Sequence, residues 1–261
     1  MIISYDIHQL KPYINWDYFF YAWGMHNKPL DERQKLQEEA VSVLTDLEGK
    51  YKAYALFRLM DAHSEGDDIA LGDGHRIPLL RQQQPGSECL CLADFLHPEH
   101  DRIGLFATSV DMGLEKDFDH DTYLKMMVQL LADRLAEAAA ECMHESVRKT
   151  YWGYAPDEQL TMQQLHAEQF QGIRPAVGYP SLPDTSLNFV LNEVLDFHQI
   201  GIRLTESGAM KPHASVSGLM ISHPAAHYFL LGTIGRDQMT DYARRRGLPV
   251  EVVRKFLSSN L

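Results

Sequence analysis

The chain has 261 residues, of which 45% are hydrophobic and 23% charged, and its formal net charge is −12. This length can bury a sizeable core, and the acidic balance argues against nucleic acid or an anionic membrane surface as a partner. No apolar run approaches the ~20 residues that a membrane helix needs, no signal-like segment follows Met1, and three cysteines fit a reducing compartment, so we expect a cytoplasmic protein.

The first half of the chain predicts two helices and a set of strands. Apolar residues recur at helical spacing in 31–49, where Asp31 can cap the helix, and again in 120–148. Between these helices, short apolar runs alternate with Gly, Asp and Pro, which is typical of an antiparallel meander. The predicted strands are 54–57, 69–71, 77–80, 89–92 and 103–106.

The second half predicts shorter elements. Thr161 and Gln164 form a capping box for a short helix, and Asp184 can cap another helix that Gly201 would stop. Further along, the predicted elements are strands at 202–206, 214–222 and 228–234, a helix from Asp237 to Gly247, and a last helix whose first residue is Pro249. Because no repeat, low-complexity tract or flexible linker interrupts the chain, we predict one α+β domain over residues 1–261.

The segment 171–180 combines two prolines and two glycines with Arg174 and Tyr179. Prolines and glycines exclude a helix and disfavour a central strand, so this segment predicts a rigid loop. A guanidinium binds carboxylates through paired hydrogen bonds, and a tyrosine ring offers a face for stacking. The loop therefore suits a ligand with a carboxylate at one end and a flat ring at the other. The alternative is an arginine that only ties down the turn through backbone carbonyls.

Other candidate chemical sites are weaker. In a strand, Cys89 and Cys91 would share a face, and His97 and His100 could approach the same zinc ion. This spacing matches no common zinc pattern, and thirteen histidines make chance pairs frequent, so we expect no metal centre. The chain also lacks a complete motif for a hydrolase, a P-loop or a dinucleotide site.

Two charged patterns have both a structural and a functional interpretation. Asp133, Glu137, Glu141 and Glu145 recur every four residues along the long helix, which is usual for a solvated face. Residues 244–246 form the only dense basic cluster, and cations in the last turn of a helix complement its dipole. The functional alternative for this cluster is docking of an acidic reductase such as a flavodoxin.

A series of chemically unusual strings resembles the activation domain of cobalamin-dependent methionine synthase. The strings are Tyr-Ile-Asn-Trp at 13–16, Leu-Ala-Asp-Arg-Leu-Ala-Glu at 131–137, His-Glu at 144–145, Val-Arg-Lys at 147–149, Tyr-Trp-Gly-Tyr-Ala-Pro at 151–156, the loop 172–180, Leu-Thr-Glu-Ser at 204–207, Ala-Ser-Val-Ser-Gly at 214–218, Asp-Gln at 237–238 and Asp-Tyr-Ala-Arg-Arg at 241–245. Their order and length make this resemblance far more specific than a single short motif.

The resemblance implies a single C-shaped α+β domain with a twisted antiparallel sheet flanked by helices. It also implies a binding site for S-adenosylmethionine, in which Arg174 pairs with the ligand's carboxylate and Glu168 anchors the loop. The adenosyl part of the ligand would be lined by Tyr179, Tyr228 and main-chain atoms around Ala176, Val177 and Phe229. Asn15 stands where the family has an aspartate that contacts the ligand.

The resemblance further implies that Asp133 and Glu137 face a cobalamin-binding module and engage the histidine that leaves cobalt. The implied chemistry is a reductive methylation, in which cob(II)alamin is reduced to cob(I)alamin and its cobalt takes the sulfonium methyl. We expect the chain to act in trans on a methionine synthase without its own activation domain, with a flavodoxin-like reductant. The alternative is a non-catalytic adaptor or sensor with this fold and a drifted ligand site.

Overall fold

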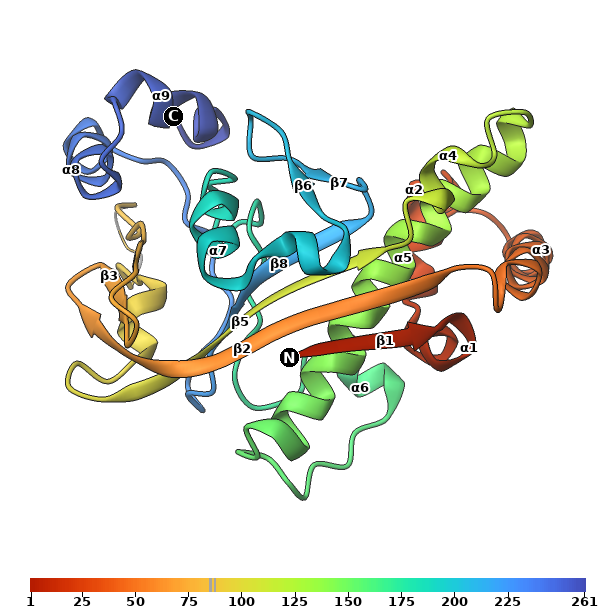
Figure 1. Ribbon diagram of the computed structural model, residues 1–261, viewed down its shortest axis with the longest axis horizontal. Coiled ribbons are helices and arrows are strands. Elements are labelled where there is room, and N and C mark those ends of the chain that lie inside the picture. The colour runs from red at the N-terminus through yellow and green to blue at the C-terminus, as the bar shows by residue number, and fades with distance from the viewer. Residues whose placement is uncertain (85, 87) are drawn as a thin grey trace.

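The computed structural model describes residues 1–84, 86 and 88–261, and an antiparallel sheet runs through its centre (Figure 1). Within these residues the sheet has six strands in the order β4-β3-β2-β5-β8, with β1 paired to β2. The strands are β1 (Ile2–Asp6), β2 (Lys52–Glu65), β3 (Asp68–Leu71), β4 (Arg76–Pro78), β5 (Asp101–Val110) and β8 (Ser215–Met220). A separate pair consists of β6 (Arg203–Leu204) and β7 (Met210–Lys211).

Side chains of the long strands β2 and β5 alternate between two hydrophobic cores on opposite faces of the sheet. Ala55 and Phe57 of β2 belong to the core that contains helix α5 (Thr122–Ser146), whereas Leu56 belongs to the core that contains helix α7 (Leu187–Leu195). On β5, Phe106 faces the α5 side and Leu105 the α7 side. The sheet is therefore buried on both faces, and α5 crosses the strands as a long rod in Figure 1.

The remaining helices lie outside the sheet. They are α1 (Ile7–Leu10), α2 (Trp16–Ala22), α3 (Leu30–Leu47), α4 (Gly113–Lys116), α6 (Met162–His166), α8 (Arg236–Arg246) and α9 (Val250–Phe256). Helices α1, α2 and α3 pack on the α5 side, and α5 continues into a π-helical turn over Val147–Tyr151. None of the described helices is both long and apolar enough to cross a membrane.

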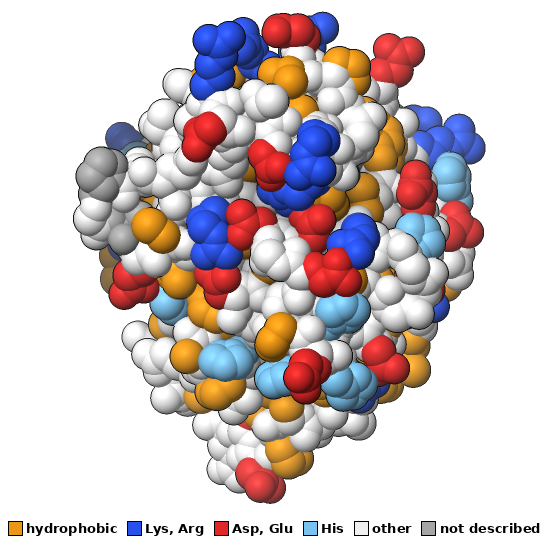
Figure 2. Space-filling view, turned by 90° about the vertical axis from the view of Figure 1, so that its left-hand side faces the viewer, with side chains coloured by type: hydrophobic (Ala, Val, Ile, Leu, Met, Phe, Trp, Pro, Cys, Tyr) orange, Lys and Arg blue, Asp and Glu red, His pale blue; other side chains and the backbone are white. Residues whose placement is uncertain are grey.

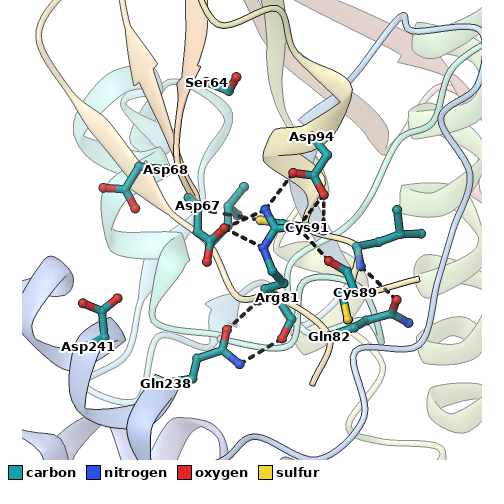
Figure 3. A network of polar contacts seen from close by, with 12 residues as sticks. Ser64, Asp67, Asp68, Arg81, Gln82, Cys89, Cys91, Asp94, Gln238 and Asp241 are labelled. Atoms are coloured by element: carbon teal, nitrogen blue, oxygen red, sulfur yellow. Dashed lines mark hydrogen bonds and ion pairs between the residues drawn. The ribbon is translucent and has the colours of Figure 1, made fainter. Parts of the chain in front are cut away.

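A network of hydrogen bonds and ion pairs connects α8 to the β3–β4 end of the sheet (Figure 3). Arg81 donates from Nε to Asp67 Oδ1 at 2.8 Å and from Nη2 to Asp94 Oδ1 at 2.7 Å. Its main chain exchanges two hydrogen bonds with the side-chain amide of Gln238 on α8, at 2.6 and 2.9 Å. Apolar residues of α8 and α9 form a third core beside this network, around Leu80 and Tyr242.

The predicted fold class is confirmed: this is an α+β fold with a curled antiparallel sheet flanked by helices. The helices predicted over 31–49 and 120–148 are confirmed as α3 and α5, and the capping box of Thr161 with Gln164 begins α6. The prediction of a single domain over residues 1–261 stays a prediction.

Two predicted strands are wrong. In 89–92 only Cys91 makes an isolated bridge, to Arg81, and a 3₁₀-helix begins at Leu92. The segment 228–234 is irregular, because its main chain bonds to a loop and to the C-terminal residues instead of to a strand; Leu231, for example, donates to the carbonyl of Pro180 at 3.1 Å. Apolar composition predicted both segments, but it does not show whether a neighbouring strand is available.

Several predicted helix caps are displaced by one or two residues. The observed N-caps of α3, α7, α8 and α9 are Pro29, Ser186, Gly235 and Pro249. Asp31 and Asp237 lie in the first turns of α3 and α8, where their charge still favours the helix N-terminus. Asp184 accepts from the main-chain N–H of Ser186 at 2.8 Å, and Gly201 ends a 3₁₀-helix after α7 instead of α7 itself.

Candidate functional site

A cavity of about 510 Å³ opens between α5 and the loop that carries Arg174. Its volume lies in the usual range for small-molecule sites. The lining residues are Tyr13, Asn15, Tyr18, Arg134, Glu137, Glu141, His166, Glu168, Arg174, Pro175, Ala176, Tyr179, Pro180, Ser181, Tyr228, Phe229 and Leu230. Segments far apart in the sequence therefore meet at one site: the start of α2, the middle of α5, the loop 174–181 and the irregular segment 228–230.

Strand β8 holds the loop in place. Ile173 donates to Ile221 at 2.9 Å, and the carbonyl of Pro175 accepts from Leu219 at 3.0 Å. The approach is so close that a Cβ on Gly218 would lie 2.2 Å from the carbonyl oxygen of Pro175. Glycine is required there, because any side chain would push the loop off the strand. The prediction of a loop that is neither helix nor central strand is confirmed.

Arg174 lies in the wall of the cavity with only 7% of its side chain exposed. Its Nη2 donates to the carboxylate of Glu141 on α5, and its main-chain N–H donates to the Tyr228 hydroxyl at 2.9 Å. Within the part of the chain that the structure describes, Arg174 Nε and Glu141 Oε2 are buried without a hydrogen-bond partner. The alternative in which Arg174 ties down its turn through backbone carbonyls is wrong, because the guanidinium bonds to a carboxylate of another element.

Buried polar atoms without partners are rare and costly, so this pair indicates a site that accepts a further polar group. Burial alone would lower the pKa of Arg174, but the carboxylate of Glu141, with smaller effects from other neighbours, raises it. The guanidinium therefore stays charged. A ligand carboxylate and a ligand cation both find complementary charge here.

Aromatic rings form the other side of the cavity. The Tyr179 hydroxyl donates to Glu137 Oε1 at 2.7 Å and so connects the loop to α5. Burial raises the pKa of Tyr179, and the neighbouring Glu137 raises it further. Burial also raises the pKa of Tyr228, to about 12. Both hydroxyls are therefore neutral near pH 7.

Seven of the eight residues predicted to hold the ligand line this cavity, and Val177 does not. The N–H of Val177 donates to Ser217 at 2.9 Å, and its side chain packs against the core on the α7 side. Of the two residues predicted to face a partner, Glu137 lines the cavity. Asp133 lies one helical turn earlier on α5, 3.7 Å from the imidazole of His213, and burial raises its pKa.

The sequence did not single out Tyr18, Arg134, His166 and Leu230, which also line the cavity. Arg134 could have been found, because it lies three residues before Glu137 on α5 and so shares its face. Its guanidinium lies 5.8 Å from the centre of the Tyr18 ring. The spacing of the sequence carries no comparable signal for His166 or Leu230.

The α5 carboxylates are less solvated than their spacing predicted. Glu141 is the partner of Arg174, and Glu145 accepts from the Tyr13 hydroxyl at 2.6 Å. Glu168 follows α6 in a left-handed backbone conformation, with φ of 55°. Burial raises its pKa, and the charge of Glu141 raises it further. The carboxylates of Glu141, Glu137 and Glu168 are thus close enough to act on the charge of Arg174.

Two further clusters from the sequence, the Cys–His cluster and the basic cluster, are partly buried or dispersed in the structure. Cys89 is exposed while Cys91 is buried, and among the described residues no group of three His, Cys, Asp or Glu side chains could hold a metal ion. Arg245 and Arg246 are buried in ion pairs with Asp68 and Asp184, so of the three arginines only Arg244 is well exposed. On that face, basic and acidic side chains are interspersed (Figure 2). Two of the three arginines of this cluster are therefore engaged within the fold, and the alternative of a docking patch for an acidic reductase stays untested.

Asn15 has two roles in the structure. Its Oδ1 accepts from the N–H of Asp17 at 3.1 Å and caps α2, and the residue also lines the cavity. Because the oxygen is engaged, the group left for a ligand is the amide N–H₂, which is a donor. Asp17 is exposed in the first turn of α2 and is not among the residues that line the cavity.

Replacing Asn15 with aspartate should tighten binding of a ligand that carries an ammonium group by about tenfold. One carboxylate oxygen keeps the helix cap, because Asp caps as well as Asn, while the other becomes a charged acceptor. Titration calorimetry with S-adenosylmethionine measures the change, and Asp17→Asn serves as the matched control with little effect. Equal dissociation constants for the wild type and Asn15→Asp would show that Asn15 does not contact the ligand's ammonium group.

Buried His144 on α5 makes a testable contribution to stability. Burial lowers its pKa well below the usual value, with smaller effects from Arg148 and Arg174. Below about pH 6.5 the unfolded chain binds a proton on this histidine that the folded chain does not, so stability should fall as pH decreases, by up to about 1.4 kcal/mol per unit. Urea unfolding between pH 7.5 and 5 should show a shallower decline for His144→Gln. An identical decline in both proteins would contradict this assignment.

The fold and the cavity together define a class of protein: an α+β domain with a charged, aromatic-lined cavity of small-molecule size. The family model described as "Vitamin B12 dependent methionine synthase, activation domain" matches residues 6–247, and the chain belongs to this family. The chain is also similar to the MetH reactivation domain, whose crystal structure was determined bound to AdoHcy. The two are 39% identical with a TM-score of 0.94, over 100% of this chain and 90% of that one. The family resemblance seen in the sequence is confirmed.

Proposed function

We propose that this chain binds S-adenosylmethionine in the cavity beside Arg174 and supports reductive methylation of cobalamin on a methionine synthase. The observation that carries this proposal is the similarity, along the whole chain, to a reactivation domain bound to AdoHcy. AdoHcy is what remains of S-adenosylmethionine after its methyl group is lost. The cavity gathers the guanidinium, the tyrosines and the carboxylates that such a ligand needs.

In this proposal, Arg174 binds the carboxylate of the methionyl part through the hydrogen-bonding capacity that Glu141 leaves free. Tyr179 and Tyr228 flank the adenosyl part, and the main chain around Ala176 and Phe229 reads the adenine edge. Cobalamin, when it is brought to the site by its own module, supplies the nucleophilic metal. The residues of this chain hold S-adenosylmethionine in a fixed position and orientation. The reaction with cobalamin then no longer depends on a chance encounter in solution.

The partner in this proposal is a cobalamin-binding module of a methionine synthase that lacks its own activation domain. Glu137 at the cavity and Asp133 one turn earlier on α5 are the residues that we place toward that module. The activation-domain family accounts for residues 6–247, so cobalamin has to be supplied from outside this domain. We further propose a flavodoxin-like reductant and a cytoplasmic location.

Mixing this protein with an oxidised methionine synthase from which the activation domain has been deleted should restore methionine formation. The restoration should require S-adenosylmethionine and a reductant, because one supplies the methyl group and the other the electron. The protein alone should form no methionine. Arg174→Ala should not restore activity. This variant is the negative control, because rescue by it would show that the effect does not depend on the cavity.

Titration calorimetry with S-adenosylmethionine separates this proposal from an adaptor with a drifted site. The replacement of the family's aspartate by Asn15 is the observation that favours the adaptor. Saturable binding by the wild type, lost in Arg174→Ala, supports reactivation. Absence of binding in a folded wild-type protein would favour the adaptor instead.

A further inference from the structure

The charged groups that line the cavity do not balance. Glu137, Glu141 and Glu168 supply three carboxylates, whereas Arg134 and Arg174 supply two guanidinium groups. With His166 counted as neutral, the lining carries one net negative charge. Inside a partly enclosed cavity this charge is screened less than on the open surface, so a ligand's own charge matters more there.

The contacts show which carboxylates stay uncompensated. Glu141 forms the only ion pair that the described lining residues make with one another, with Arg174. Glu137 accepts a hydrogen bond from Tyr179, and a neutral hydroxyl leaves the charge of the carboxylate in place. The side-chain carboxylate of Glu168 makes no hydrogen bond or ion pair with any described residue, and the residue is exposed where it lines the cavity. Glu141 Oε2 is itself buried without a hydrogen-bond partner.

The charge of the ligand changes during the reaction proposed above, on which this inference rests. S-adenosylmethionine carries a carboxylate, an ammonium and a sulfonium, and its net charge is positive. When the methyl group leaves, the electron pair of the carbon–sulfur bond stays on sulfur and the nucleophile supplies the pair for the new bond. The sulfonium becomes a neutral thioether, so the product AdoHcy has no net charge.

We propose that Glu137 and Glu168 make the cavity selective for the sulfonium ligand over its thioether product. With S-adenosylmethionine the charges of ligand and lining cancel, whereas with AdoHcy one carboxylate of the lining stays uncompensated. Methyl transfer thus removes the charge that favours binding, and the spent ligand is released in exchange for a new one.

Dissociation constants for three ligands test this inference: S-adenosylmethionine, AdoHcy and sinefungin. Sinefungin has an amine-bearing carbon in place of the methylated sulfur, so it keeps a positive charge without a transferable methyl group. S-adenosylmethionine and sinefungin should each bind at least about tenfold tighter than AdoHcy. The variants Glu137→Gln and Glu168→Gln keep side-chain shape and should each reduce this preference by about threefold or more. Glu193→Gln, an exposed change on α7, is the matched control and should retain it.

The outcomes separate this inference from the proposed function. If all three ligands bind equally well, or if both cavity variants retain the full preference, the selectivity is wrong while the binding site stands. If the preference survives in Glu137→Gln and is lost in Glu168→Gln, Glu168 alone provides it and Glu137 is removed from the proposal. If no ligand binds to the folded wild-type protein, both the selectivity and the proposed function fail.

Discussion

Arg174→Ala should weaken binding of S-adenosylmethionine about 10- to 100-fold, the largest effect that we expect for a single change in the cavity. Charge-assisted hydrogen bonds contribute roughly 1.5–3 kcal/mol, and about 1.4 kcal/mol corresponds to one decade of affinity. The substitution also leaves Glu141 without its ion-pair partner, so the ligand's carboxylate would meet a carboxylate in place of a guanidinium. Calorimetric titration of the folded variant measures the loss.

Arg174→Ala should also destabilise the fold, which the sequence alone did not predict. A proline-flanked loop arginine has little packing role, but here the side chain is buried against Phe106, with the guanidinium 5.6 Å from the ring centre. Arg174→Lys is therefore the informative companion, because it keeps a cation beside Glu141 while it loses the paired geometry for a carboxylate. We expect Arg174→Lys to bind weakly and to remain near wild-type stability. Wild-type affinity in either variant would contradict the assignment of Arg174.

The sequence predicted the parts of the fold that local patterns determine. Apolar periodicity identified α3 and α5, and side-chain capping identified the start of α6. The strand predicted at 228–234 failed for a physical reason: a strand requires a hydrogen-bonding neighbour, and the chain places Pro180 and the C-terminal residues beside this segment instead of another strand. Nothing local distinguishes such a segment from a true strand.

The site could be predicted only in part for a related reason. Loop composition marked Arg174 and Tyr179, and the family resemblance added Asn15, Glu168 and Tyr228. The ion pair of Arg174 with a carboxylate 33 residues earlier depends on how α5 packs against the sheet. The donor that Asn15 presents depends on which of its atoms caps α2. Long-range packing and hydrogen-bond direction are properties of the folded chain, so the sequence could not supply them.

Arg148 and Glu158 form a second buried ion pair behind the loop that carries Arg174. Arg148 has no exposed side-chain surface, Glu158 has 7%, and two hydrogen bonds of 2.8 and 2.6 Å join them. The Arg148 guanidinium also lies 4.2 Å from the ring centre of Phe170, four residues before Arg174. The pair therefore supports the segment that leads into the loop of Arg174 as well as the end of α5.

Glu158→Ala should lower the free energy of unfolding by about 3–5 kcal/mol, because removal of one partner leaves a buried charge without compensation. Urea denaturation measures this loss, and Arg244→Ala, which breaks an exposed pair with Asp241, should cost about 1 kcal/mol or less. The double variant Arg148→Met/Glu158→Leu should recover most of the stability, since matched apolar groups leave no charge to solvate. Affinity for S-adenosylmethionine should fall in Glu158→Ala as Phe170 loses its support. Equal losses in Glu158→Ala and Arg244→Ala would show that the buried pair contributes no more than a surface contact.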